Sequence, residues 1–396
     1  MKILFTCILN FWFVIAFGQS NDLIPIGIAD TVHSELLNEE RIILVHVPGK
    51  SDPLQADKNF PVVYVLDGER HFQTVVALMH EMSTATGDEK CPEMIVVGIK
   101  NKGKNRSRDL VPSSTIEDDK FAQFLQEELI PYVDTSYPTI SFRTLIGHSI
   151  GGLRTINTAI NQPDLFNAYV AIDPSLSYNN NTWFHKNITD STLNTLNEEP
   201  IFIGMAHVMP AGMNLDELKT DTTGATLHSR KIYEFSQLME LESSNFGWKY
   251  YRDETHGSSP ILSIYDGFEH LFSWFPIENL NSIFDDSTTP EQALNIINEH
   301  YENVSQRMGT KYLPPEAFIK QLAYYLFPKG LKEKAYAFVG MNLENYPNSC
   351  SAHEMMGTAY YYQGNKEKAI EMYEQALKIQ EVPSIKGKLK RLTLEE

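Results

Sequence analysis

The chain has 396 residues, of which 42% are hydrophobic and 21% are charged, which is enough for one large domain or two smaller ones. Its 33 Lys and Arg residues are outnumbered by 51 Asp and Glu residues, and the formal net charge is -18. Because no basic tract is present to neutralise phosphates, the composition argues against a nucleic-acid partner and against an anionic membrane partner.

The first 18 residues predict a signal peptide. Met1 and Lys2 give a positive start, residues 3–17 form an apolar run, and Ala16 and Gly18 supply the small residues of a cleavage site. An uncleaved anchor is disfavoured because the run is short for a membrane span and Asn10 interrupts it. We expect cleavage after Gly18 and an exported protein, periplasmic or secreted, without a membrane span in the mature chain.

Only two cysteines, Cys91 and Cys350, lie beyond this segment. They are too far apart in the sequence to form a disulfide framework, and they lack the spacing of metal ligands. We therefore expect neither a metal site nor a cofactor.

Residues 19–275 are predicted to form one domain, and from about residue 40 its strand-like and helix-like segments alternate. Several strand candidates are continuous apolar runs, such as VVYVL, which is typical of strands covered on both faces of a mostly parallel sheet. Helical patterns lie between them, for example at 121–133 and 226–242. The alternation predicts an α/β fold, a mostly parallel sheet with helices on both faces. The predicted strands are 42–47, 61–66, 94–99, 143–146, 168–172, 201–205 and 248–251.

The strongest functional motif is the stretch FRTLIGHSIGG at 142–152. A short apolar strand runs into Gly147-His148-Ser149-Ile150-Gly151, and a helical pattern follows. G-x-S-x-G in this setting is a nucleophile elbow, a sharp turn that lifts a serine oxygen above a sheet. The motif predicts Ser149 as a catalytic nucleophile and the backbone N–H of Ile150 as one donor of an oxyanion hole.

A serine nucleophile requires a base, which in this architecture follows the last strand. His256 stands in Asp253–Ser258, just past the last strand candidate, and we predict it as the base. His228 and His270 fall within helical patterns, where a surface histidine is expected. His207 follows the preceding strand and stays an alternative.

The acid that orients the base is expected on the loop after the strand at 201–205. This loop offers Asp216, Glu217 and Asp221, and no carboxylate stands immediately after the strand. We select Asp221, because it opens a Thr-rich turn before the next helix that could hold it rigidly. A simple turn or helix-start role is the competing interpretation.

The second oxyanion donor is expected in the loop after VVYVL, which reads Asp67-Gly68-Glu69-Arg70. Gly68 permits close approach of the backbone, so its N–H or that of Glu69 is predicted to point at the oxygen. An ordinary Asp-Gly turn is the alternative.

Residues 276–396 have a different sequence pattern, without the alternation of strands and helices. Residues 276–290 predict a polar linker, and no strand candidate follows. The sequence KEKA at 332–335 recurs 34 residues later at 366–369, and this period is that of the tetratricopeptide repeat. Residues 291–396 are therefore predicted to form a helical tetratricopeptide-like domain, with a plain helical hairpin as the alternative.

Taken together, these residues resemble the esterase D-like family of α/β-hydrolases. That family includes feruloyl and acetylxylan esterases, catechol-siderophore esterases, S-formylglutathione hydrolases and mycolyltransferases. The resemblance covers about residues 30–275. It is carried by PVVYVLDGERHF (61–72), MIVVGIKN (94–101), SRDLVP (107–112), FLQEELIPYVDTSY (124–137), RTLIGHSIGGL (143–153), PDLFNAYVAIDPSL (163–176) and DETHGSSP (253–260).

The resemblance implies that Ser149 and His256 are catalytic and that the second oxyanion donor lies near Gly68. It places Arg108 and Asp109 near the rim of the active site, and we interpret them, like the segment 173–175, as shaping the pocket without a chemical role. Many relatives have Asp or Glu directly after the strand where this chain has His207 and Val208. The position of the acid therefore departs from the family pattern.

The sequence favours an exported serine esterase with a small-molecule ester substrate, either a siderophore or a carbohydrate-linked feruloyl or acetyl ester. The alternative is a non-catalytic hydrolase-fold scaffold that binds a protein partner through its helical repeats. The intact Ser149 and His256 favour the enzyme, whereas the missing acid after the strand favours the scaffold.

Overall fold

The computed structural model of the chain describes residues 25–49, 58–84, 89–101 and 103–394. The predicted signal peptide at 1–18 lies outside these residues. Among the helices of the described ranges, none is both long and apolar enough to cross a membrane.

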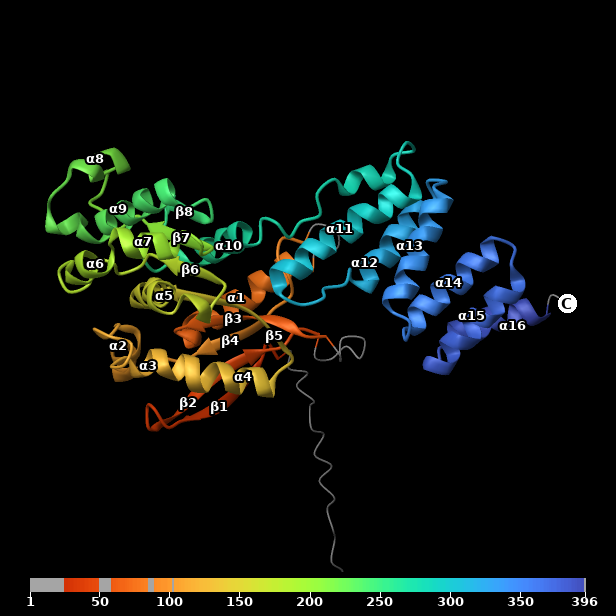
Figure 1. Cartoon of the computed structure of the whole chain (residues 1–396), viewed down its shortest axis with the longest axis horizontal. Coiled ribbons are helices and arrows are strands. Elements are labelled where there is room, and N and C mark those ends of the chain that lie inside the picture. The colour runs from red at the N-terminus through yellow and green to blue at the C-terminus, as the bar shows by residue number, and fades with distance from the viewer. Residues whose placement is uncertain (1–24, 50–57, 85–88, 102, 395–396) are drawn as a thin grey trace, which may run out of the picture.

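The α/β prediction is confirmed by an eight-stranded, mostly parallel sheet (Figure 1). Its order is β1-β2-β4-β3-β5-β6-β7-β8; β1 pairs with β2 and β2 with β4 in antiparallel fashion, and every other neighbouring pair is parallel. The strands are β1 Ile28–Ser34, β2 Glu39–His46, β3 Phe60–Leu66, β4 Ile95–Ile99, β5 Thr139–His148, β6 Ala168–Ile172, β7 Ile201–Ala206 and β8 Phe246–Tyr251.

Strand β1 is the one strand of this sheet that sequence analysis missed. It lies at the edge of the sheet, and most of its side chains are exposed or half-buried. An edge strand of the sequence IADTVHS lacks the apolar run by which the buried central strands were recognised.

Side chains of β3 show how the central strands are buried on both faces. Val62, Tyr64 and Leu66 belong to one hydrophobic cluster, whereas Val63 and Val65 belong to the other, as the two-residue period of a strand requires. Helices α1 and α10 pack on the second face, and η2, α5 and α9 pack on the first. The helices around the sheet are α1 Gly68–Ser83, α2 Lys104–Leu110, α3 Lys120–Gln123, η2 Phe124–Leu129, α4 Ile130–Ser136, α5 Ile150–Asn161, η3 Pro163–Leu165, α6 Thr182–Asn187, α7 Asp190–Leu196, α8 Leu215–Thr220, η4 Gly224–Thr226, α9 Leu227–Glu242 and α10 Pro260–Leu271.

The C-terminal region is all-helical, as predicted, and extends away from the sheet (Figure 1). Gly357 of α14 packs directly on Tyr373 of α15: a Cβ at Gly357 would lie 2.8 Å from the tyrosine ring, so this crossing requires a residue without a side chain. The small residues of the 34-residue period therefore set how closely the helices pack. The helices are α11 Pro290–Met308, α12 Glu316–Leu326, α13 Lys332–Asn345, α14 Cys350–Tyr362, α15 Lys366–Ile379 and α16 Pro383–Leu394.

This helical region packs against the sheet domain through α11. Val304 and Met308 are buried in the same hydrophobic cluster as Phe272 and Phe275. Residues 276–290, predicted as a polar linker, include the short helix η5 Leu280–Phe284. The buried Lys334 of α13 donates a hydrogen bond to the carbonyl of Ile283 at 3.0 Å, so the connection between sheet and repeats is held by specific contacts.

Candidate active site

Ser149 lies in the turn between β5 and α5, at the carboxyl edge of the sheet. Its φ of 61° and ψ of -118° are strained for a residue with a side chain. A Cβ at Gly147 would lie 2.2 Å from the carbonyl oxygen of Gly151, and one at Gly152 would lie 3.0 Å from Pro174. Gly147 and Gly152 thus leave no room for a side chain beside the turn, and the turn has the form of the predicted elbow.

His256, the predicted base, contacts a buried carboxylate. Its Nδ1 lies 2.5 Å from Oδ2 of Asp173, the residue that directly follows β6. The same oxygen lies 3.1 Å from Nε2 of His228, and Oδ1 accepts a hydrogen bond from the backbone N–H of Ala206 at 3.0 Å. A carboxylate can only accept, so both ring nitrogens donate to Asp173.

The environment keeps Asp173 ionised. Burial alone would raise the pKa of its carboxyl, but the hydrogen bonds from His228 and His256 outweigh that effect and lower the pKa to about 2. A permanently charged, fixed carboxylate can orient the ring of His256 and stabilise its protonated form.

The predicted acid, Asp221, does not contact His256, and the structure places Asp173 there instead. The carboxylate of Asp221 accepts hydrogen bonds from the backbone and hydroxyl of Thr223, at 3.1 and 2.8 Å, and from the hydroxyl of Thr226. It therefore has the local turn role that was the competing interpretation.

The carboxylates of the two other candidate acids also bind groups close to them in the sequence. Asp216 pairs with Lys219 at 2.9 Å, and Glu217 accepts from the backbone N–H of Asn214 at 3.0 Å. Sequence analysis assigned Asp173 only to the wall of the pocket, because it searched for the acid after β7. The sequence does contain a feature that points to Asp173. It is an aspartate directly after β6, the buried strand that pairs with β5, and β5 leads into Ser149.

His148, the residue before the nucleophile, is buried and supports His256. Its Nε2 lies 2.8 Å from the backbone carbonyl oxygen of His256, and the two rings are 4.5 Å apart. Burial, reinforced by the neighbouring His256 and His71, lowers the pKa of His148 to about 3. His148 is therefore neutral near pH 7 and donates its proton to that carbonyl.

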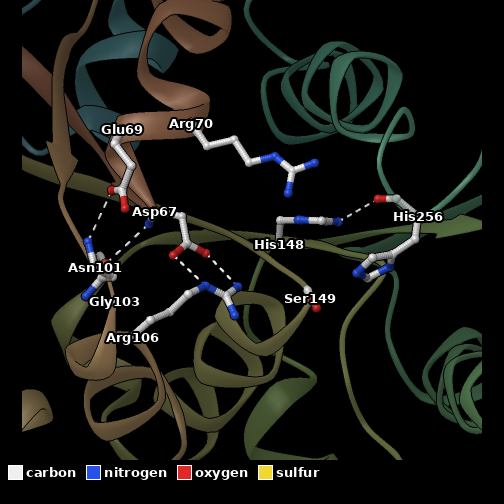
Figure 2. Close-up of a pocket in the computed structure, with 9 residues that line it drawn as sticks. All are labelled: Asp67, Glu69, Arg70, Asn101, Gly103, Arg106, His148, Ser149 and His256. Carbon is white, nitrogen blue, oxygen red and sulfur yellow. Dashed lines mark hydrogen bonds and ion pairs between the residues drawn. The ribbon is translucent and has the colours of Figure 1, made fainter.

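Ser149, His148 and His256 line one pocket of about 480 Å³ (Figure 2). Two arginines also face it. Arg106 is neutralised by both carboxylate oxygens of Asp67, each at 2.8 Å. Arg70 donates only to the carbonyl of Gly257 at 3.4 Å, and within the part of the chain that the structure describes no carboxylate lies within ion-pair distance of it. The complete lining is Asp67, Glu69, Arg70, Asn101, Gly103, Arg106, His148, Ser149 and His256.

The predicted oxyanion donors lie at the starts of two helices. Ile150 is the first residue of α5, and Gly68 is the first residue of α1. The first N–H groups of a helix have no acceptor within it, so both positions offer free donors. A Cβ at Gly68 would lie 2.4 Å from the backbone of Gly98, which explains the glycine, and Asp67 before it has a left-handed φ of 53°.

Arg108 and Asp109, predicted to shape the pocket, do not line it. Arg108 pairs with Glu39 at 2.6 Å, pointing toward β2. Asp109 is buried and accepts from Arg41 at 2.7 Å and from the side chain of Asn101 at 3.1 Å. Asp109 thus acts on the pocket through Asn101, whose Oδ1 accepts from the N–H of Asp67 at 3.2 Å. The helical turn of α2 directs Arg106 to the pocket instead.

Residues 34–203 match the protein family described as Putative esterase, and residues 350–381 match the tetratricopeptide repeat. The part of the chain from residue 34 to residue 203 is therefore similar to this family of esterases. The family resemblance and the repeat assignment made from the sequence are both confirmed.

Curated relatives of the esterase domain include two siderophore esterases. The ferri-bacillibactin esterase BesA of Bacillus subtilis is 25% identical over 191 residues, 43% of this chain and 66% of that protein. The siderophore triacetylfusarinine C esterase of Aspergillus fumigatus is 27% identical over 139 residues, 32% of this chain and 48% of that protein. The chain thus spans about half to two thirds of the length of the curated relatives that it matches.

Among solved structures, an IroE-like serine hydrolase from Shewanella oneidensis superposes with a TM-score of 0.63 at 26% identity. The match covers 80% of this chain and 99% of that one. The esterase domain therefore shares its fold with a hydrolase.

Proposed function

We propose that the protein is a serine esterase in which Ser149 is the nucleophile, His256 the base and Asp173 the acid. The observation that carries this proposal is the 2.5 Å contact between Nδ1 of His256 and the buried carboxylate of Asp173, in a pocket that also holds Ser149. This contact disfavours the scaffold alternative, because a strongly shifted carboxyl pKa beside a histidine and a serine in one pocket is typical of catalytic sites.

The reaction follows from the protonation states. With Nδ1 of His256 donating to Asp173, its Nε2 carries the lone pair that removes the proton of the Ser149 hydroxyl as the oxygen attacks an ester carbonyl. The N–H groups of Ile150 and Gly68 stabilise the oxyanion. His256 returns its proton to the leaving alcohol, and a water molecule, activated in the same way, then releases the acid from Ser149.

We propose a siderophore ester as the substrate. Three curated relatives are named for this activity, and the guanidinium of Arg70, which has no carboxylate partner among the described residues, suits an anionic, iron-binding ester. A neutral carbohydrate-linked ester offers Arg70 hydrogen-bond acceptors but no opposite charge. Siderophore hydrolysis also agrees with export into the periplasm or the medium, which we infer from residues 1–18.

The helical repeats have two candidate roles. Tetratricopeptide repeats bind partner peptides in other proteins, and a protein partner remains our proposal for the exposed faces of α12–α15. The buried contacts of α11 with the sheet also support a stabilising role.

The test compares hydrolysis of a ferric siderophore ester, a feruloyl ester and p-nitrophenyl acetate by the wild-type protein and three variants. We expect Ser149→Ala and Asp173→Asn to lose roughly 10³-fold or more in kcat/KM. Asp221→Asn is the matched control, because its carboxylate serves only a surface turn, and it should keep near wild-type activity. Activity that survives Ser149→Ala contradicts the mechanism, and full activity of Asp173→Asn removes Asp173 from it.

A further inference from the structure

Three side chains at the back of the candidate active site form a set of metal ligands. Oδ2 of Asp173, Nε2 of His228 and Nδ1 of His256 all lie within 4.8 Å of one another. They come from three distant parts of the chain: the end of β6, the first turn of α9, and the loop after β8. Sequence analysis, which considered only cysteine spacing, expected no metal site.

From this juxtaposition we propose that Asp173, His228 and His256 bind a divalent zinc ion, and that zinc reversibly inhibits the enzyme. Two imidazoles and one carboxylate with an open fourth position make up a ligand set that zinc commonly adopts in proteins. The inhibitory consequence, though not the binding, rests on the proposed role of His256 as the base.

The geometry requires little movement. Zinc binds nitrogen and oxygen at about 2.0–2.2 Å, so ligand atoms around one tetrahedral ion lie about 3.3 Å apart. The two histidine nitrogens already lie 2.5 and 3.1 Å from Oδ2 of Asp173. A shift of about an ångström in the two rings opens room for the ion between them.

The carboxylate ligand of the proposed site is buried, whereas the two histidine ligands can be reached from solvent. Asp173 is fully buried, and the N–H of Ala206 fixes its other oxygen, so the anionic ligand is preorganised. The side chains of His228 and His256 are 22% and 40% exposed, which gives an ion access from solvent. A bound zinc ion would take the place of the two N–H groups that now donate to the carboxylate of Asp173. Its positive charge would also compensate the negative charge of that carboxylate.

Inhibition follows from the tautomer of His256. Zinc takes the lone pair of Nδ1, so the proton that stood on Nδ1 must move to Nε2, and the neutral ring then presents an N–H donor where the mechanism needs an acceptor. His228 likewise moves its proton from Nε2 to Nδ1. No net proton is released, and removal of zinc by a chelator restores the original tautomers.

The binding test uses the full chain with Ser149→Ala, which retains all three ligands. In competition with a chromogenic zinc chelator, we expect one zinc ion per chain and at least a tenfold weaker affinity when His228→Gln is added. Gln keeps an N–H donor near the position of Nε2 but supplies no imidazole. His185→Ala, which removes an exposed histidine of α6, is the matched control and should leave the affinity unchanged.

The inhibition test uses the protein with Ser149 intact. Zinc, but not magnesium, should lower the rate of p-nitrophenyl acetate hydrolysis, and a chelator should restore it. His228→Gln should be at least tenfold less sensitive, each variant being compared with its own zinc-free rate. Asp173→Asn in the Ser149→Ala chain gives a second binding variant if His228→Gln does not fold.

Equal zinc affinity with and without His228→Gln, or no zinc bound to the Ser149→Ala chain, overturns the site. Stoichiometric binding that leaves the hydrolysis rate unchanged overturns the inhibition. The binding arm needs no esterase activity, so a failure of the proposed function and a failure of the zinc site give different results.

Discussion

Nε2 of His148 donates a hydrogen bond to the backbone carbonyl of His256 at 2.8 Å. This contact ties the residue before the candidate nucleophile to the loop that carries the candidate base. Because His148 ends β5 and is fixed by the sheet, its hydrogen bond fixes the loop after β8 relative to that strand. His148 is therefore a positioning residue for His256.

Replacing His148 by Phe keeps an aromatic ring against His71 and His256 but removes the donor. We expect kcat to fall by roughly 10- to 100-fold with KM changed less than about twofold, because a small displacement of the base affects the transition state more than substrate binding. His185→Phe serves as the control for an exposed histidine. An unchanged kcat in His148→Phe contradicts the positioning role.

Two buried histidines should make the fold sensitive to acid. Burial, with nearby Arg70 and Arg106, lowers the pKa of His71 to about 4, and burial with the neighbouring histidines lowers that of His148 to about 3. Their ordinary value is about 6.5. At a pH between the ordinary pKa and the pKa in the folded protein, these histidines are protonated in the unfolded chain but not in the folded chain. The free energy of unfolding therefore has its full value above about pH 6.5 and falls as the pH is lowered.

At pH 5 each of these two histidines should lower the free energy of unfolding by up to about 2 kcal/mol relative to pH 7.5. Urea unfolding at the two pH values measures the difference. His71→Phe and His148→Phe should each reduce it, whereas His185→Phe, at an exposed position of α6, should not. A pH dependence identical in all four proteins rules this explanation out.

The contact of Lys334 with residues 283–285 should contribute to the stability of the helical region. Lys334→Met keeps the aliphatic stem but leaves the carbonyls of Ile283 and Asp285 without their donor, and we expect a loss of about 1–3 kcal/mol. Lys368 holds the same place in the second repeat but is exposed, so Lys368→Met is the control and should cost less than about 0.5 kcal/mol. Thermal unfolding followed by circular dichroism compares the two, and equal losses contradict the prediction.

Arg70 should discriminate between anionic and neutral esters. We expect Arg70→Gln to raise KM for a ferric siderophore ester roughly 10-fold or more, because a charge-assisted contact is lost, while KM for p-nitrophenyl acetate changes little. Arg391→Gln, on the exposed face of α16, controls for the loss of one positive charge. If Arg70→Gln changes KM for both substrates equally, Arg70 only shapes the pocket. The argument for an anionic substrate is then contradicted.

Much of the fold was encoded locally and could be predicted from the sequence. Runs such as VVYVL predict buried parallel strands because both of their faces need apolar cover, and the 34-residue period predicts stacked helices. The elbow at Ser149 is likewise local, because only glycine fits where Gly147 meets Gly151. Strand β1 was not predicted, because it lies at the exposed edge of the sheet and has no continuous run of apolar residues.

The candidate site was only partly predictable, because the acid depends on which strands lie side by side. Asp221 was selected because it lies on the loop after β7 and opens a Thr-rich turn, yet its carboxylate is bound within that turn and does not reach His256. Asp173 meets His256 because β6 lies between β5 and β7 in the sheet, so the ends of strands far apart in sequence come together at one edge. The sequence alone determined the nucleophile's motif and its setting, since these depend on neighbouring residues. Only the tertiary structure decided which carboxylate and which second histidine surround His256, since that depends on strand order.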